Sequence, residues 1–365
     1  MEKDPYKEYI IIEEPSKEEK EFAWKTAIGL QQVDGLETSD YLKKIAIDNI
    51  NGKITLKETR ELIDNYYVEN KDYNEKTLEA DKVSMCITEL LSINSFTFSL
   101  NEYVNIHEYL FKGILKHAGK IRDYDITKKE WVLDGDTVTY GSSSSIIDSL
   151  NYDINLEKNF DYSNLSDDEV IKHIARFISN LWQIHAFGEG NTRTTAVFLI
   201  KYLRKIGYNV TNDLFKENSW YFRNALVRAN YNNREKKIYE TTKYLELFLR
   251  NVMLNENNEL KNRYLNIAFE TNKSEEKEDI EVQKVDIESK KVDIDLSNYH
   301  LTVKTKDNIR EIYKKYSNSY FGRNDVTKIL NLSNAGASKF IKLLLENNII
   351  IPITGKGKGK YIFNI

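Results

Sequence analysis

Residues 166–206 read SDDEVIKHIARFISNLWQIHAFGEGNTRTTAVFLIKYLRKI, and this stretch decides the fold. It opens on Ser166-Asp-Asp-Glu169, a capping box with acidic residues at the positive end of the helix dipole. Apolar residues then recur at helical spacing as far as Ile184, and a second, strongly apolar helix begins at Thr194. We therefore predict two long helices joined by the loop His185–Arg193.

The loop contains four residue types that phosphate chemistry uses. His185, with a usual pKa of about 6.5, can take a proton from a hydroxyl at neutral pH. Glu189 is an oxygen ligand suited to Mg²⁺, and Arg193 offers parallel N–H donors to phosphate oxygens. Gly190 lies at a helix start, where free N–H groups attract anions. The set predicts a phosphoryl or nucleotidyl transfer site; the plainer alternative is a tight turn whose histidine only partners a helix dipole.

The loop resembles the signature of the Fic family, H-x-F-x-[D/E]-G-N-x-R, at His, Phe, Glu, Gly, Asn and Arg. The flanking residues 181–208 and 217–231 are similar to bacterial Fic domains as well. The resemblance extends from about residue 20 to the C-terminus. It implies a mainly α fold, with a helical Fic core, a β-hairpin flap and a C-terminal winged helix-turn-helix domain.

The resemblance also implies a protein adenylyltransferase, which transfers AMP from Mg-ATP to a Tyr, Thr or Ser hydroxyl of a target protein, itself included. By position, His185 is the catalytic base, Glu189 is the metal ligand, and Phe187 points into the core and anchors the loop. Tyr221 and Asn230 stand where the family places adenosine contacts, although Tyr221 suits a helix core equally. The residues expected to contact the nucleotide are Glu189, Gly190, Asn191, Thr192, Arg193, Thr194, Thr195, Ala196, Tyr221 and Asn230.

Two positions depart from the family pattern. Thr192 replaces the usual glycine, and Ala196 replaces a second arginine that normally helps to hold the terminal phosphate. Two alternatives therefore stay open: transfer of a different nucleotide, or a catalytically weak Fic fold that acts as a DNA-binding regulator.

A hairpin pattern precedes the loop. Residues 130–140 read EWVLDGDTVTY, two β-rich runs around the pair Asp134-Gly135. The segment corresponds to the flap of the family, which aligns the target by strand addition. We therefore expect a target protein to dock on residues 130–140.

Residues 1–75 are expected to form an N-terminal helical segment that resembles the antitoxin of some Fic toxins. In the family, an inhibitory [S/T]-x-x-x-E-[G/N] motif pairs its glutamate with the second arginine; the nearest match here is Leu30–Gly35. Asp34 is shorter than glutamate, and Ala196 stands where the family has its second arginine. We therefore expect no strong inhibitory clamp, that is, no ion pair between these two positions. Asp34→Gly should then change self-modification less than about tenfold. Alternatively, the segment only covers the core.

Length and composition give the domain plan. With 365 residues, the chain is too long for one hydrophobic core. It has only 15 Gly and 3 Pro, and so few helix-breaking residues favour long helices. We expect a Fic domain at 76–268, an acidic linker at 269–299 and a further domain at 300–365. A single cysteine argues against a disulfide framework, and the lack of an apolar run of 18 residues argues against a membrane span. We therefore expect a cytoplasmic location. A homodimer stays open.

Residues 300–365 have 12 basic and 4 acidic residues, a net charge of +8. Three short helices followed by two β-rich runs around Gly355–Lys360 are typical of a winged helix-turn-helix, in which Asn334–Leu345 would enter the major groove. Lys339, Lys342 and the Gly355–Lys360 loop would contact phosphates. The partner stays open between DNA and another protein.

Overall fold

The computed structural model describes residues 14–70, 73–211, 213–269, 301, 303–316, 320–330, 332–353 and 359–364. The chain divides into two compact units, residues 1–279 and 280–365, and each is described by itself. The predicted linker at 269–299 lies outside the described residues except for its first position. Among the described helices, none is both long enough and apolar enough to cross a membrane.

The N-terminal helices begin at the capping residues that the sequence indicates. Ser16 and Thr55 each form a complete capping box, and the Ser39 hydroxyl accepts a hydrogen bond from the third residue of its helix. These side chains satisfy N–H groups that the first helical turn leaves without partners. The helices are α1 (Lys17–Leu30), α2 (Asp40–Ile50) and α3 (Leu56–Glu69).

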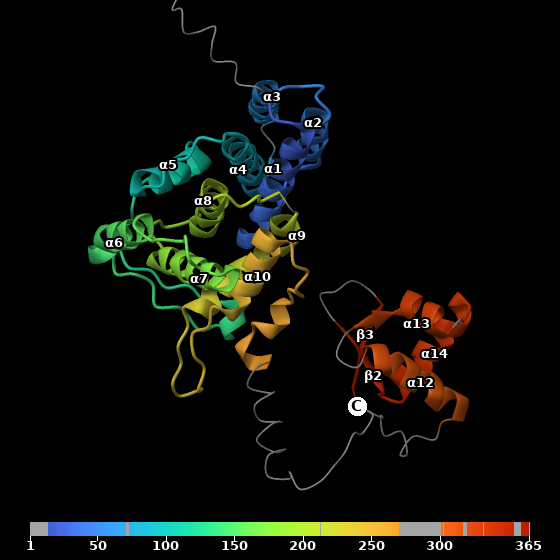
Figure 1. Ribbon diagram of the computed structural model, residues 1–365. Coiled ribbons are helices and arrows are strands. Elements are labelled where there is room, and N and C mark those ends of the chain that lie inside the picture. The colour runs from blue at the N-terminus through green and yellow to red at the C-terminus, as the bar shows by residue number, and fades with distance from the viewer. Residues whose placement is uncertain are drawn as a thin grey trace, which may run out of the picture. The chain divides into compact units, whose positions relative to one another are not determined.

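Helix α8 is the central element of unit 1, and Figure 1 shows α4, α5 and α7 around it. Its residues Val197–Ile200 are fully buried on every side, as expected for a helix surrounded by others. This packing fixes the position of its N-terminus, where the loop ends. The bounds are α4 (Glu75–Ser92), α5 (Leu100–Phe111), α7 (Asp167–Ile184) and α8 (Asn191–Lys205).

The N-terminal segment shares a core with the rest of unit 1, because α1 packs against α4 and α9. Gly29 permits the close approach to α9: a Cβ at this position would lie 2.5 Å from the Lys216 Cα. The remaining helices of the unit are α6 (Ile146–Lys158), α9 (Leu214–Ala229) and α10 (Lys243–Leu254).

Glycines set two helix boundaries. Helix α5 ends at Phe111, because Gly113 takes a φ of 80°, which an α-helix does not allow. Helix α8 begins at Asn191, three residues before the predicted start, because Gly190 turns the chain with a φ of 73°.

The expectation of a two-stranded β-hairpin at residues 130–140 is wrong. The segment forms a 3₁₀ turn, η2 (Trp131–Leu133), followed by Asp134 and Gly135 with φ of 54° and 85°. Val132 and Leu133 are both fully buried, which the alternation of a strand does not permit. Glu130 closes the turn: its N–H donates to Asp136 O and its carbonyl accepts from Gly135 N.

Unit 2 combines three described helices with a small antiparallel sheet of order β1-β3-β2. The predicted pairing of residues near 350 with residues near 362 is present, with Ile351 opposite Ile362. Strand β1, which is only two residues long, was not predicted. The elements are α12 (Val303–Tyr316), β1 (Phe321–Gly322), α13 (Arg323–Leu330), α14 (Asn334–Glu346), β2 (Ile350–Pro352) and β3 (Lys360–Phe363).

Candidate functional site

The loop begins at a strained residue. His185 follows α7 with φ 50° and ψ 58°, and its N–H donates to Trp182 O at 3.0 Å. A residue with a Cβ pays on the order of 1–2 kcal/mol in this left-handed region. Such strain persists only where the surroundings fix the conformation, and it concentrates at functional sites.

Phe187 and Asn191 hold the loop in shape. The Phe187 ring is fully buried and stacks on His107, with centroids 3.7 Å apart and planes 13° apart. The Asn191 side chain accepts from Phe187 N at 3.0 Å and donates to Phe187 O at 2.6 Å. Phe187 thus lies where an anchor was expected, and the Asn191 amide is engaged with the loop itself.

His107, on α5, holds the loop through a hydrogen bond. Its Nδ1 accepts from Gly119 N at 2.9 Å, so the proton is on Nε2, which donates to Glu189 O at 3.1 Å. Burial, against the opposing hydrogen bond to Glu189 and together with the nearby charge of Arg193, lowers the pKa of His107 to about 4. His107 is therefore neutral at pH 7.

The N-terminus of α8 has no side-chain cap among the described residues. Its N-cap residue is Gly190. The first N–H groups of α8 therefore lack the intrahelical acceptors that later residues have. A Cβ on Gly190 would lie 2.4 Å from two atoms of the Phe111 ring, so only glycine fits. These features suit an anion.

The His185 ring is placed as a base. Its Nδ1 lies 3.3 Å from Trp182 O, which can only accept, so Nδ1 carries the proton and Nε2 presents its lone pair. Nε2 is buried and has no hydrogen-bond partner among the described residues. Burial lowers the pKa of His185 well below its usual value, and Lys128, Arg122 and Arg223 add to the effect.

Arg122 fixes His185 from outside the loop, and no sequence pattern indicates it. Its Nε donates to His185 O at 2.7 Å, and its Nη2 donates to the carbonyls of Ile184 and Gly141. Its Nη1 donates to Tyr124 O at 2.5 Å. One buried guanidinium therefore holds the end of α7 and two neighbouring segments together.

An ion pair holds the segment 130–140 against α9. The buried Glu130 carboxylate pairs with Arg223, with Nη1 to Oε2 at 2.6 Å, and accepts from the Tyr140 hydroxyl at 3.0 Å. The Tyr140 ring lies 4.3 Å from the His185 ring, between centroids. Burial lowers the pKa of the neighbouring Lys128, against the opposing charges of Asp34, Glu130 and Glu189.

Arg193 is engaged by the N-terminal helices. Its Nε lies 2.8 Å from Asp34 Oδ2, its Nη2 2.7 Å from Glu79 Oε1, and its Nη1 donates to Gln31 at 3.0 Å. The guanidinium also lies 4.7 Å from the centre of the Phe111 ring. The expectation of no strong clamp rested on the missing arginine at position 196; in the structure Asp34 pairs with the motif arginine, Arg193, instead.

The next four predicted nucleotide contacts are buried residues of α8. The Thr192 hydroxyl accepts from the Trp182 indole at 3.0 Å, and the Thr195 hydroxyl lies 3.1 Å from the Tyr103 hydroxyl. Thr194 and Ala196 are fully buried. The structure directs these side chains into the interior, and Thr194 N donates to Gly190 O at 3.0 Å, so among these four residues only Thr192 has a first-turn N–H without an intrahelical acceptor.

Tyr221 and Asn230 lie on α9 or at its end, away from the loop's own hydrogen bonds. The Tyr221 hydroxyl donates to Tyr244 O at 3.2 Å, and Asn230 donates to Ser179 O at 3.0 Å and Leu226 O at 2.9 Å. Both side chains are buried and join neighbouring helices. Their contact with adenosine stays a prediction.

Glu189 is exposed, with only its backbone carbonyl held by His107. Over the described residues, no group of three or more His, Cys, Asp or Glu could form a cage for a metal ion. One free carboxylate beside an uncapped helix N-terminus fits Mg²⁺ that arrives with phosphates, since Mg²⁺ commonly takes few protein ligands.

Residues 97–203 match the model of the Fic/DOC family, so this part of the chain is a Fic/DOC family domain. Proteins with such domains commonly transfer AMP or other nucleotide groups to proteins. No curated protein matches the sequence.

Two solved structures are similar. The N-terminal FIC domain of Bep8, a VirB-translocated effector protein from Bartonella sp. 1-1C, is 18% identical, with a TM-score of 0.39 over 49% of this chain and 84% of that one. A Fic family protein from Desulfovibrio desulfuricans G20 is 12% identical, with a TM-score of 0.40 over 94% and 87%.

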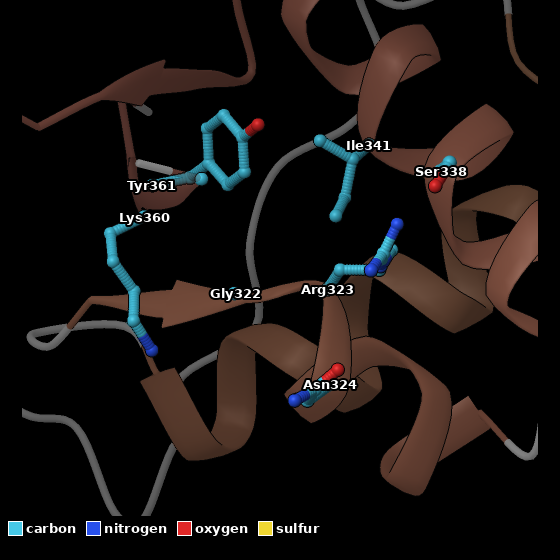
Figure 2. A pocket seen from close by; sticks show the side chains of 8 residues that line it. Gly322, Arg323, Asn324, Ser338, Ile341, Lys360 and Tyr361 are labelled. Atoms are coloured by element: carbon cyan, nitrogen blue, oxygen red, sulfur yellow. The ribbon is translucent and has the colours of Figure 1, made fainter. Parts of the chain in front are cut away.

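Unit 2 has a pocket of about 440 Å³ between α13, α14 and β3. Figure 2 shows Arg323 pointing toward Ser338 and Ile341 of α14, with Lys360 and Tyr361 of β3 across from them. Among the described residues that line this pocket none is acidic, although Lys360 Nζ lies 3.9 Å from Asp325 Oδ2. Its two cations and polar groups suit an anion.

Proposed function

We propose that unit 1 is a protein adenylyltransferase, which transfers AMP from Mg-ATP to a Tyr, Thr or Ser hydroxyl of a target protein, itself included. The observation that carries the proposal is the unpartnered lone pair of His185 Nε2 beside the uncapped N-terminus of α8. A neutral histidine with a free Nε2 can take the proton of an attacking hydroxyl.

The geometry supports His185 as base in two ways. Trp182 O fixes the tautomer through Nδ1, and Arg122 fixes the backbone through His185 O. The lowered pKa keeps the ring unprotonated at neutral pH, so Nε2 is ready to accept. The lowered pKa also makes His185 a weaker base, so its position relative to the attacking hydroxyl has to compensate for the lost basicity.

The phosphates would bind at the first turn of α8. The N–H groups that follow Gly190 would receive phosphate oxygens, and Glu189 would hold Mg²⁺. When bound, Mg²⁺ neutralises phosphate charge and favours the departure of pyrophosphate. Arg193 can contribute only after Asp34 and Glu79 release it.

The nucleotide donor stays open, because Ala196 supplies no cation for a terminal phosphate. Lys128 is the neighbouring cation, and its charge is felt by both His185 and Glu189. Transfer of a different nucleotide is therefore the alternative that the experiment must include.

We place target docking on residues 130–140, although they form a turn and not strands. Trp131 is 52% exposed and offers an apolar contact there. The Glu130–Arg223 pair holds the turn against α9, so a bound segment would meet a rigid surface beside Tyr140 and His185.

The test is labelling of native lysate by the full chain with Mg²⁺ and α-labelled ATP, GTP, CTP or UTP in turn. We expect label on protein with ATP, a loss of about 10²–10⁴-fold in His185→Ala, and unchanged nucleotide binding. His117→Ala, at an exposed position, is the matched control. Absence of labelled protein with all four nucleotides would contradict a transferase and favour the regulator.

For unit 2 we propose a winged helix-turn-helix that binds DNA. The order of its elements supports the proposal: α13 and α14 are adjacent helices, and β2 and β3 form a hairpin after them. Exposed Lys339 and Lys342 on α14, with Arg323 in the pocket, offer cations to phosphates. The predicted contacts at 355–358 lie outside the described residues.

Retention on a fluorescent DNA duplex tests this second function. We expect binding that weakens steeply with salt, with Lys339→Gln reducing the salt slope by about 1. Lys315→Gln, an exposed change on α12, should leave binding unchanged. Removal of residues 300–365 should abolish retention while self-labelling remains. Retention that ignores salt would favour a protein partner.

A further inference from the structure

A tyrosine hydroxyl rests on the loop that contains His185 and Glu189. A Cβ built on Gly188 would lie 2.5 Å from the Tyr124 hydroxyl oxygen, so this oxygen occupies the space where a side chain would otherwise stand. Tyr124 is nevertheless 53% exposed. Its hydroxyl therefore contacts the loop while the ring remains accessible to water.

Arg122 ties this tyrosine to the base. The same guanidinium donates to Tyr124 O at 2.5 Å and to His185 O at 2.7 Å, and Arg122 N donates to Ala186 O at 2.9 Å. The backbones of Tyr124 and His185 are thus separated by a single planar group. A side chain at position 124 can reach the loop without any change of fold.

Three other hydroxyls near the loop are buried and engaged. Tyr140 donates to Glu130, Thr192 accepts from Trp182, and Thr195 pairs with Tyr103. For the Tyr124 hydroxyl, by contrast, the described part of the chain shows no hydrogen bond that would hold it back. An acceptor must be accessible and in contact with the loop that carries the base, and Tyr124 meets both conditions.

We propose that Tyr124 is the acceptor of self-modification, an inference that rests on the proposed transferase function. The Tyr124 oxygen would form a bond to the α-phosphorus of a nucleoside triphosphate. The bond from that phosphorus to the bridging oxygen of pyrophosphate breaks, and pyrophosphate leaves with the electron pair. The phenolic proton goes to His185 Nε2. The product is a tyrosyl nucleotide ester on the rim of the site.

Peptide mapping of the full chain tests the proposal directly. Trypsin releases Asp123–Lys128, in which Tyr124 is the only tyrosine, and fragmentation separates it from Thr127. After incubation with Mg²⁺ and ATP we expect the added AMP on Tyr124. Tyr124→Phe should lower self-labelling at least about tenfold, whereas Tyr152→Phe, at a position 69% exposed on α6, should not.

A measurement without transfer complements the mapping. In His185→Ala, nitration by tetranitromethane reports the accessibility of each tyrosine, and we expect ATP with Mg²⁺ to protect Tyr124 at least about threefold but not Tyr152. Equal nitration with and without ATP would overturn the proposal. Label on the chain at another residue would overturn it and leave the transferase standing. Absence of label on every protein would overturn both.

Discussion

Asp34 and Arg193 form an ion pair between the N-terminal segment and the Fic loop, with Asp34 Oδ2 2.8 Å from Arg193 Nε. Glu79 engages the other side of the same guanidinium at 2.7 Å. Only 2% of the Arg193 side chain is exposed, so its donors are occupied by protein groups. The arginine that a phosphate would need is therefore held by two carboxylates.

We expect Glu79→Gln to raise the affinity for nucleotide and the rate of self-labelling by roughly tenfold, which corresponds to about 1.4 kcal/mol. Asp34→Asn should act in the same direction but less, because the Asp34 carboxylate is 39% exposed and water screens its charge. Titration with ATP, followed by fluorescence, measures the affinity.

Asp40→Asn is the control for this prediction, since the Asp40 side chain is fully exposed on the same segment. An unchanged affinity in both Glu79→Gln and Asp34→Asn would show that the acids do not compete with phosphate for Arg193.

The pH dependence of transfer should follow His185. A base works only when unprotonated, and because burial and Lys128 lower the pKa of His185, the rate should stay constant from pH 7 to below about 6.5. Lys128→Gln removes a charge that opposes protonation, so the acid limb should move to higher pH by about 0.5–1 unit. Rates measured from pH 5 to 8 give the profile.

Lys129→Gln should leave the acid limb in place, because Lys129 is exposed and contributes nothing to the lowered pKa of His185. Equal pH profiles for Lys128→Gln and the parent chain would show that the charge of Lys128 does not influence the pKa of His185.

Gly190→Ala should destabilise the chain by about 2–4 kcal/mol. The new Cβ would meet the Phe111 ring at 2.4 Å, and the residue would keep a φ of 73°. Gly135→Ala shares the positive φ but has nothing within 4 Å of its Cβ, so it should cost only about 1 kcal/mol. Urea unfolding measures both, and equal losses would show that Phe111 yields.

His107 should make the folded chain sensitive to acid. In the unfolded chain it binds a proton below about pH 6.5, and in the folded chain only below about pH 4. Because the unfolded state then binds more protons, the free energy of unfolding falls as the pH drops through this window, by about 3 kcal/mol in total.

His107→Gln should flatten the fall between pH 6.5 and 4.5, although the lowered pKa of His185 leaves part of it. His117→Gln, at an exposed position, should preserve the parent curve. A curve unchanged in His107→Gln would show that His107 titrates at its ordinary pKa.

The sequence revealed what depends on neighbours in the chain. Ser166 caps its helix within the next turn, and the pattern there predicted the helix start correctly; Ser16, Ser39 and Thr55 cap their helices by the same local rule. The loop between α7 and α8 follows from the same local rules.

Distant partners left no such pattern. Arg193 meets Gln31 and Glu79 from 162 and 114 positions away, and nothing around those residues distinguishes them from other polar positions on amphipathic helices. The Asp134-Gly135 pair misled for a related reason. Both residues take positive φ as in a hairpin, but the burial of Val132 and Leu133 wound the preceding residues into a 3₁₀ turn.

The two hydrogen bonds between Asn191 and Phe187 have a thermodynamic consequence. They close a small ring at the start of α8, so the backbone of the first turn is held in place before any anion arrives. A ligand then loses little affinity to ordering the loop, since the backbone entropy of these residues is already spent in folding. We expect a ligand to bind to this loop as to a preformed, rigid site. The release of Arg193 should then be the slow and regulated step.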